Sequence, residues 1–386
     1  MHTEFVDPAS ALQALIDAAV AGGIPGISVA VVGRDGVVSL ASAGQADVVS
    51  RVPVRSDMLF GIGSITKTFV AVVILQLAEE GRVALDATAP SVLGAAVQGI
   101  PNADVATIAQ LLNHTGGVPS WEDDPAWIRD GRGAALDVNR VWGKADTLAY
   151  VAGHAPLSPP GLQFGYANTN FTLLGLVIEK LTGAQAMSEI RRRILAPLGI
   201  DEIYLEGFEP LPRSRLSHRY HWITPEFRST AGVNAAFTEV HPGLLDVSAS
   251  NLSVEWTAGG MVATARALAS FGAALRDGRL LSPRSTRFMT QWFPVASQAT
   301  HDAFRNAHVG HNLFRSQYAD GLAVVGHDGD VLGFSGSLYW VEGTDVVVAV
   351  LCNVGSMHAG AAAGGVAYSV AKTTQFIEAV RRLGTR

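Results

Sequence analysis

Hydrophobic residues near the N-terminus recur first with helical and then with strand spacing. Residues 7–23 carry apolar side chains three and four positions apart, between an acidic start and a Gly-Gly stop, which predicts a helix. The apolar runs at 26–33 and 36–44 are joined by the turn Arg34-Asp35-Gly36 and predict two short strands. The chain therefore begins with a helix followed by a hairpin.

The C-terminal third repeats this mixture. Residues 322–329, 334–343 and 345–355 are apolar runs of strand length, and they predict three consecutive antiparallel strands. Residues 263–278 before them and 368–384 after them have helical spacing. A sheet built from both ends of the chain and covered by the terminal helices would form an α/β sandwich.

The segment between these ends has a different character. Residues 88–261 contain more proline and tryptophan, long polar connections and short helical patterns, of which 169–183 and 189–199 are the clearest. We therefore predict an α/β fold, with an antiparallel sheet flanked by helices and a mostly helical inserted lobe. The α/β lobe would comprise residues 1–87 plus 262–386. The active site would lie between the two lobes, where pockets tend to form.

Composition narrows the class of protein. The 386-residue chain is 48% hydrophobic and 16% charged, which favours a large core and argues against disorder. Its formal net charge of -6 is spread without long basic runs, so it lacks the clustered positive surface that nucleic acids require. No stretch approaches the ~18 uninterrupted apolar residues of a membrane span. We expect neither nucleic acid nor membrane as a partner.

Two features bear on the compartment. Glu4, Asp7 and Asp17 fall where a signal peptide would be basic or apolar, and no Lys or Arg precedes Arg34, so we read no export signal. The single cysteine, Cys352, cannot form an internal disulfide and reads as a buried, small apolar residue. Both features favour a cytoplasmic location, although a secreted mature chain given a new start methionine would look the same.

Ser64 and Lys67 stand three positions apart at the start of an apolar helical pattern that runs to about Glu80. Residues at i and i+3 share one helix face, so both side chains would point the same way. Burial and the positive end of the helix disfavour a protonated amine, so Lys67 could be the base that activates the Ser64 hydroxyl. The alternative is a serine that caps a surface helix beside a solvated lysine. The spacing of Ser64 and Lys67 alone does not distinguish these two possibilities.

Tyr166 and Asn168 come just before the helical pattern at 169–183. Beside an ammonium group, a tyrosine hydroxyl can have a lowered pKa and carry a proton to the leaving group. The Asn168 amide could hold Lys67 and a substrate amide by hydrogen bonds. Taken alone, Tyr-Ala-Asn could equally be a turn.

His327 ends a predicted strand and is followed by Asp328, Gly329 and Asp330. A glycine at this point lets a substrate backbone lie close to the strand. The backbone N–H groups of Asp330 and Ser64 could together form an oxyanion hole. On its own, His-Asp-Gly would more often be a hairpin turn.

Together and in this order, the three motifs resemble those of the serine penicillin-recognising family. That family contains class C β-lactamases, D-alanyl-D-alanine carboxypeptidases, D-amino-acid amidases and related esterases. Five flanking stretches are also similar: LAEEGRVALD, TIAQLLNHTGGV, ILAPLGI, TAGGMVAT and LRDGRLLS. The resemblance covers most of the chain. It implies a β-lactamase/transpeptidase-like fold, an acyl-enzyme mechanism, and neither a metal nor an organic cofactor.

The resemblance also implies roles for the catalytic residues. Ser64 matches the acylated nucleophile and Lys67 its general-base partner. Tyr166 matches the proton shuttle, and Asn168 matches the side chain that holds the substrate amide. His327 stands where β-lactamases have lysine and the carboxypeptidase branch has histidine.

The third motif departs from the family pattern. Members that bind a free carboxylate usually have a hydroxyl residue where this chain has Asp328, and often a small residue where it has Asp330. Two like charges about 4 Å apart cost about 4 kcal/mol at an effective dielectric of about 20, so these side chains would disfavour β-lactams and peptides with a free carboxylate. Arg315 could instead clamp a carboxylate, or pair with either aspartate. We expect Asp328, Gly329, Asp330 and Arg315 to bind substrate. The alternative for either aspartate is a side chain that points away into a turn and leaves only the backbone N–H at the site.

The sequence thus predicts a serine acyl hydrolase acting on a small amide, peptide or ester, with a D-amino-acid amide or peptide hydrolase preferred. A carboxylesterase, a D-alanyl-D-alanine carboxypeptidase, a β-lactamase and a biosynthetic transacylase stay open. A binding module that has lost turnover is the alternative outside enzymes. His114 reads as structural. The tryptophans of the middle segment belong either to the core or to the wall of an acyl pocket: Trp121, Trp127, Trp142 and Trp256.

Overall fold

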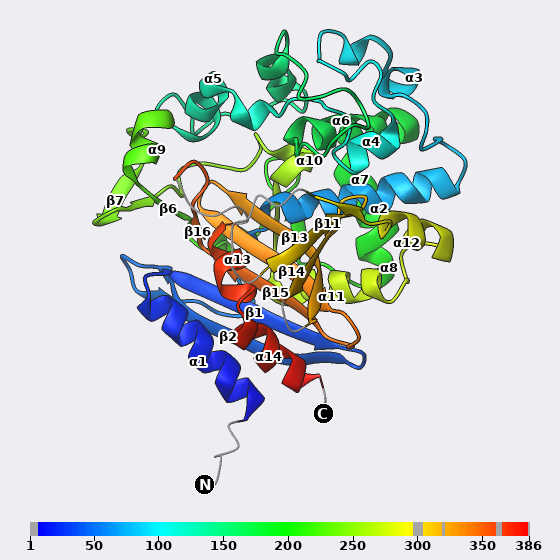
Figure 1. Ribbon diagram of the computed structural model, residues 1–386. Coiled ribbons are helices and arrows are strands. Elements are labelled where there is room, and N and C mark those ends of the chain that lie inside the picture. Colours follow the sequence, from blue (N-terminus) through cyan, green and yellow to red (C-terminus); the bar gives the residue numbers. More distant parts are fainter. Residues whose placement is uncertain (1–6, 296–303, 319–320, 360–364, 385–386) are drawn as a thin grey trace.

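Both ends of the chain build one central sheet in the computed structural model, which describes residues 7–295, 304–318, 321–359 and 365–384 (Figure 1). Its nine strands are antiparallel to their neighbours, and the N-terminal strand lies directly beside a C-terminal one. In spatial order they are β10 (Phe293–Pro294), β11 (Phe304–Val309), β12 (Phe314–Tyr318), β13 (Ala323–Val331), β14 (Phe334–Val341), β15 (Val347–Cys352), β1 (Gly26–Gly33), β2 (Gly36–Asp47) and β3 (Val52–Pro53). The predicted mixed α/β fold with an antiparallel sheet is confirmed.

The central strands are apolar throughout because helices cover both faces of the sheet. In β15, Val348, Val350 and Cys352 pack on one side, while Ala349 and Leu351 pack on the other, as the period of two requires. Helices α1 (Pro8–Ala21), α13 (Gly365–Ala371) and α14 (Thr374–Leu383) cover the first side, and α11 (Ala265–Arg276) covers the second. Figure 1 shows α1 and α14 beside each other on the blue N-terminal hairpin.

The remaining elements lie mainly on the α11 side of the sheet. The described residues also form two small sheets. The β4–β9–β5 sheet packs on that side, whereas Tyr220 and Leu244 of the β16–β6–β8–β7 sheet belong to the core on the α1 side. The division of the chain into two lobes stays a prediction. The other α-helices of the described residues are α2 (Thr66–Glu79), α3 (Ala89–Leu93), α4 (Ile108–Leu112), α5 (Pro125–Trp127), α6 (Asn168–Thr182), α7 (Ala186–Ile190), α8 (Ala196–Leu198), α9 (Pro225–Thr230), α10 (Trp256–Gly259) and α12 (Pro283–Met289). The short strands are β4 (Phe60–Gly61), β5 (Ile203–Leu205), β6 (Tyr220–Trp222), β7 (Thr238–His241), β8 (Leu244–Asp246), β9 (Met261–Ala263) and β16 (Val354–Gly355).

Helix α2 lies inside the molecule, with the sheet below it and α6 and α10 above it in the view of Figure 1. Every residue from Thr66 to Leu75 is buried. A helix that is apolar all round is a core helix, and this one has almost no polar face. Its first turn therefore places any polar side chain in a water-poor environment.

Two details differ from the sequence-based prediction. The predicted C-terminal helix is two helices, because the Thr373 side chain accepts the N–H of Phe376 and starts α14 anew. Strands β11 and β12 extend the sheet beyond the three strands predicted for this end. Both are more polar than the central strands, so hydrophobic periodicity does not mark them.

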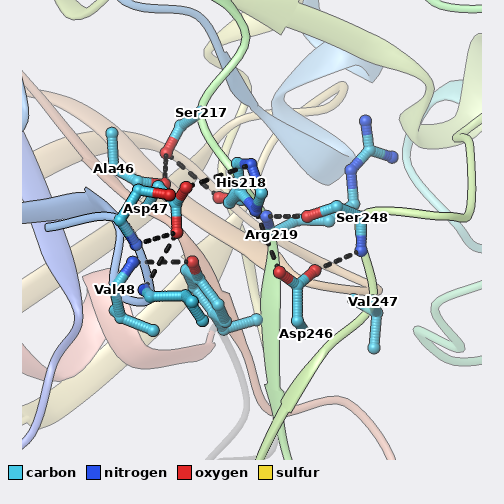
Figure 2. A network of polar contacts seen from close by, with 12 residues as sticks. Ala46, Asp47, Val48, Ser217, His218, Arg219, Asp246, Val247 and Ser248 are labelled. Atoms are coloured by element: carbon cyan, nitrogen blue, oxygen red, sulfur yellow. Dashed lines mark hydrogen bonds and ion pairs between the residues drawn. The ribbon is translucent and has the colours of Figure 1, made fainter. Parts of the chain in front are cut away.

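A polar network joins the end of β2 to the small sheet that contains β6 and β8 (Figure 2). The His218 ring lies 2.9 Å from the Asp246 carboxylate and 3.8 Å from that of Asp47. Ser217 Oγ donates to the carbonyl oxygen of Ala46 at 3.3 Å. These contacts tie the N-terminal hairpin to residues more than 150 positions later. Within the described part of the chain, no helix has the length and apolar character needed to cross a membrane.

Candidate active site

The first turn of α2 brings Ser64 and Lys67 into contact, as their spacing predicts. Ser64 lies in a 3₁₀ helix (Gly63–Ile65) that runs directly into α2. Lys67 Nζ lies 2.8 Å from Ser64 Oγ and donates to the carbonyl oxygen of Ala258 at 2.6 Å. The lysine has no exposed surface. The amine is therefore held between the candidate nucleophile and a backbone carbonyl of α10.

The surroundings of Lys67 favour its uncharged form. Burial lowers the pKa of Lys67 from 10.5 to about 7. The carboxylates of Glu122 and Glu255 oppose this shift, and Arg132 adds to it. Near pH 7 much of the lysine is then a free amine, whose lone pair can accept the proton of the Ser64 hydroxyl.

Tyr166 completes the cluster around the serine. Its ring centroid lies 5.0 Å from Lys67 Nζ, and its hydroxyl shares a hydrogen bond with Ser64. Burial raises the pKa of Tyr166 well above 10, Glu122 raises it further, and the hydrogen bond only partly opposes this. The expected lowering of this pKa is wrong, because burial of the hydroxyl outweighs the hydrogen bond that would stabilise the phenolate. Tyr166 keeps its proton in this state.

His114 holds the turn that carries Tyr166. Its ring stacks on that of Tyr166 with centroids 4.4 Å apart, and its Nδ1 accepts the backbone N–H of Ala167 at 3.2 Å. The backbone N–H of Asn168 donates to Ser120 Oγ at 3.0 Å, where α6 begins. Asn168 is buried, and its Oδ1 has no hydrogen-bond partner among the described residues. Among the described residues, the predicted hydrogen bond from this amide to the lysine is not formed, and Oδ1 is an unused acceptor.

His327 is a neutral side chain in this site. Its Nδ1–H donates to the carbonyl oxygen of Asp328 at 2.6 Å, which fixes the tautomer because a carbonyl only accepts. Burial, reinforced by Lys67, lowers the pKa of His327 to about 3. Its Nε2 is buried and has no partner in the described part of the chain. The ring centroid lies 6.4 Å from that of Tyr166, so His327 belongs to the same cluster of side chains.

Two glycines let β13 lie directly against the residues around Ser64. Gly63 has a φ of +52°, and a Cβ there would stand 2.8 Å from the backbone nitrogen of Asp330. A Cβ on Gly329 would stand 2.8 Å from the backbone nitrogen of Ser64 and would overlap the carbonyl oxygen of Ile62. The backbone nitrogens of Ser64 and Asp330 therefore meet at one junction, where the sequence predicts the oxyanion hole.

The side chains of Asp328 and Asp330 do not face this junction. They lie on the opposite face of β13 from His327, since side chains alternate along a strand. The Asp328 carboxylate lies 3.5 Å from Lys372 Nζ, and the Asp330 carboxylate accepts the hydroxyl of Ser356 at 2.9 Å. The prediction that both carboxylates meet the substrate is wrong, and so is the repulsion argument built on it. At Asp330 only the backbone can reach a ligand.

Arg315 is also turned away from the serine. Its guanidinium makes two hydrogen bonds of 2.8 Å to the two carboxylate oxygens of Glu342. The prediction of a carboxylate clamp, or of a pair with Asp328 or Asp330, is therefore wrong. Glu342 follows β14 and supplies the matching bidentate partner, which sequence spacing does not reveal.

Several residues that shape the site lie outside the three catalytic motifs. Glu122, Arg132 and Glu255 act on Lys67 through their charges, and Ala258 contributes only its carbonyl oxygen. They come from separate segments, so no spacing links them to Ser64. The described residues contain no group of three or more His, Cys, Asp or Glu that could hold a metal ion. The tryptophans in question are core residues, each at most 3% exposed: Trp121, Trp127, Trp142 and Trp256.

Comparison with known proteins decides the family. The beta-lactamase family model matches residues 12–371. The chain belongs to the beta-lactamase family. Penicillin-binding protein 4 of Amycolatopsis lactamdurans is 29% identical to this family member over 333 residues, which cover 86% of the chain and 81% of the relative. Esterase EstB of Burkholderia gladioli is 31% identical over 222 residues, or 55% of each protein.

Solved structures agree with the assignment of this chain to the beta-lactamase family. A D-stereospecific amidohydrolase from Streptomyces sp. is 30% identical, with a TM-score of 0.75 over 90% of this chain and 94% of that one. D-amino acid amidase from Ochrobactrum anthropi SV3, in complex with D-phenylalanine, is 25% identical, with a TM-score of 0.81 over 98% of this chain and 100% of that one. This beta-lactamase family member is a serine hydrolase that transfers acyl groups.

Proposed function

We propose that the protein hydrolyses the amide or peptide bond of small substrates that carry a free amine, with D-amino-acid amides as the preferred class. Ser64 forms the acyl-enzyme. The preference for an amine rests on one observation, the carboxylate of Glu122 beside the catalytic cluster. The preference for the D configuration is supported by the names of the two amidases to which the chain is similar.

The arrangement supports the following sequence of bond changes. Ser64 Oγ attacks the substrate carbonyl while Lys67 takes the hydroxyl proton. The backbone N–H groups of Ser64 and Asp330 stabilise the oxyanion. Tyr166 gives its proton to the leaving amine and regains one from Lys67, so the amine leaves neutral and the acyl ester remains. Water then attacks this ester with the same groups acting in reverse, which releases the acid and restores Ser64.

Glu122 supplies the negative charge that a substrate ammonium group would meet. Its negative charge acts on Lys67, on Tyr166 and on Asp330. Its Oε2 is buried and has no hydrogen-bond partner among the described residues. A buried carboxylate oxygen without a donor costs free energy, which a charged N–H donor from the substrate would recover.

The cations described near the site offer little to a substrate carboxylate. Lys67 is only partly protonated near pH 7, and His327 is neutral. Arg132 and Arg315 are each bound to a glutamate of the protein. This balance of charge, rather than the aspartates of the third motif, is the reason to expect slow turnover of β-lactams and acyl-D-Ala-D-Ala peptides, which carry a free carboxylate.

A substrate comparison with a Glu122→Gln variant tests the proposal. The variant is expected to raise KM for D-phenylalanine amide about 10- to 100-fold, because a hydrogen bond to a charged group contributes about 1.5–3 kcal/mol. Hydrolysis of p-nitrophenyl butyrate, which has no amine, should change little at pH 8.5, where Lys67 is largely uncharged with or without Glu122. N-acetyl-D-phenylalanine amide should be a poor substrate of the natural protein.

Two controls accompany this comparison. Ser64→Ala should abolish turnover of both the amide and the ester, and Glu226→Gln, on the surface helix α9, should affect neither. Faster turnover of nitrocefin or of an acyl-D-Ala-D-Ala peptide than of any amino-acid amide would contradict the proposal. Equal loss of amide and ester hydrolysis in Glu122→Gln would contradict the role given to this carboxylate.

A further inference from the structure

A fully buried ion pair, Arg132 with Glu255, lies beside the candidate base. Arg132 Nη2 donates to Glu255 Oε1 at 2.7 Å, and the two side chains are only 1% and 3% exposed. The guanidinium lies 5.1 Å from the ring centroid of Trp127. A buried ion pair is weak evidence of stabilisation, because desolvating both charges offsets much of their attraction. Its position next to Lys67 points to another role.

The pair is connected to Lys67 through the α10 turn. Glu255 immediately precedes α10, and its carbonyl oxygen accepts the N–H of Ala258 at 2.8 Å. The carbonyl oxygen of Ala258 in turn accepts Lys67 Nζ. Trp256, the first residue of α10, has a φ of +38°, a backbone conformation that costs energy for a bulky residue. Such a turn persists only where its surroundings hold it.

We propose that the Arg132–Glu255 pair is a positioning unit for Lys67, which fixes the α10 turn that holds the amine and places two opposite charges beside it. This inference rests on Lys67 acting as the base, as proposed above. Neither residue touches the substrate in this scheme. Both act on the reaction through the lysine alone.

The charges around Lys67 agree with this role. Glu255 raises the pKa of Lys67, and Arg132 lowers it. Burial raises the pKa of Glu255, and Arg132 opposes that shift most strongly. The other titratable groups that face the amine come from four further segments of the chain: His114, Glu122, Tyr166 and His327. Removing Glu255 should therefore lower the pKa of Lys67, and removing Arg132 should raise it.

The pH dependence of kcat/KM for p-nitrophenyl butyrate distinguishes positioning from a purely structural role. Glu255→Gln leaves Arg132 unopposed, so the acidic limb should move to lower pH by about one unit. Arg132→Met removes the cation, so the limb should move to higher pH. Arg132→Lys keeps the charge and should keep the midpoint of the natural protein. A structural defect would lower activity without opposite displacements of the limb.

The double variant Arg132→Met/Glu255→Gln keeps the test decisive if a single variant does not fold. It buries no unpaired charge, so its midpoint should return close to that of the natural protein, while the loss of the α10 support lowers kcat about tenfold. The matched control is Glu189→Gln/Arg193→Met, which removes another buried ion pair. Glu189 on α7 is 7% exposed, and Arg193, in the segment after α7, is 6% exposed. Neither residue acts on the pKa of Lys67. This control should change neither kcat nor the midpoint.

The outcomes separate this inference from the proposed function. Opposite displacements in the single variants support the positioning role. Where a single variant does not fold, a lower kcat with an unmoved midpoint in a double variant of unchanged Tm supports it. Displacements of the same sign, or full kcat in the double variant, overturn it. If the natural protein has no acidic limb near pH 7, or if Lys67→Met retains that limb, then the role of Lys67 as base fails and the proposed function fails with it.

Discussion

The junction between Gly329 and the residues around Ser64 gives the sharpest test of the site. A Cβ added at Gly329 would overlap the carbonyl oxygen of Ile62 and stand 2.8 Å from the backbone nitrogen of Ser64. Neither neighbour is a flexible side chain, so the backbone itself must move. The Gly329→Ala variant should therefore separate β13 from the start of α2, with only one methyl group added.

The size of the effect follows from what the junction holds. Ordinary contact requires the two backbones to move apart by roughly 1 Å, and a displacement of that order at a reacting centre can cost about 10²-fold in rate. Loss of one oxyanion-hole donor costs about 10²–10³-fold in kcat, or about 3 kcal/mol. We therefore expect kcat to fall about 10²–10³-fold, with KM little changed. Overpacking should also lower the free energy of unfolding by about 1–3 kcal/mol.

Burst kinetics with p-nitrophenyl butyrate measure the acylation rate directly, and thermal unfolding followed by circular dichroism shows whether the variant is folded. Gly22→Ala is the control, because its φ is -77° and the nearest atom to the new Cβ lies 3.3 Å away at the end of α1. That variant should keep its full rate. A folded Gly329→Ala protein with an acylation rate within threefold of the natural one would refute the assignment of the oxyanion hole to this junction.

Three further predictions follow from individual side chains. Lys67→Met should lower the acylation rate about 10³-fold, and kcat/KM of the natural protein should rise with pH through about 7, because only the uncharged amine accepts the proton; a flat pH–rate profile would contradict this. The hydrogen bond that His218 donates to the Asp246 carboxylate raises the pKa of His218 above its ordinary 6.5. The stabilisation is therefore fully present below pH 6.5, where Asp246 is still ionised, and is lost as pH rises through the folded value. His218→Gln should therefore lower Tm more at pH 6 than at pH 8.5 in thermal melts, and an equal loss at both would exclude the ionic contribution. Arg315→Gln should leave KM for amides, esters and carboxylate-bearing peptides within about twofold, since Glu342 already occupies the guanidinium.

The fold was predictable where hydrophobic periodicity is strong. The pattern at 26–33 matches β1 and the pattern at 7–23 contains α1, because both elements bury most of their length or a whole face. The polar strands β11 and β12 were not predictable, since their apolar residues do not alternate and their pairing depends on the neighbouring strand β13. The start of α14 is set by a single capping threonine within a continuous helical pattern, so the break is a local hydrogen-bonding effect.

The close contacts of the site were predictable only where they are local in sequence. Ser64 and Lys67 share a helix face, and that spacing alone brings them within hydrogen-bond distance. Glu122, Arg132 and Glu255 reach the same amine from segments that lie far apart, so only tertiary structure assembles them. Even the direction of the Tyr166 pKa depends on burial, which no motif encodes.

The aspartates of the third motif show that one error was avoidable from the sequence. The strand that contains His327 was predicted, and side chains two apart on a strand share a face. If His327 faces the serine, then Gly329 does so as well, and Asp328 and Asp330 must face the other side. The structure follows this rule, with Lys372 and Ser356 receiving the two carboxylates there. Substrate charge preference in this site must therefore come from residues outside the strand, which is why Glu122, and not the third motif, is the residue to change first.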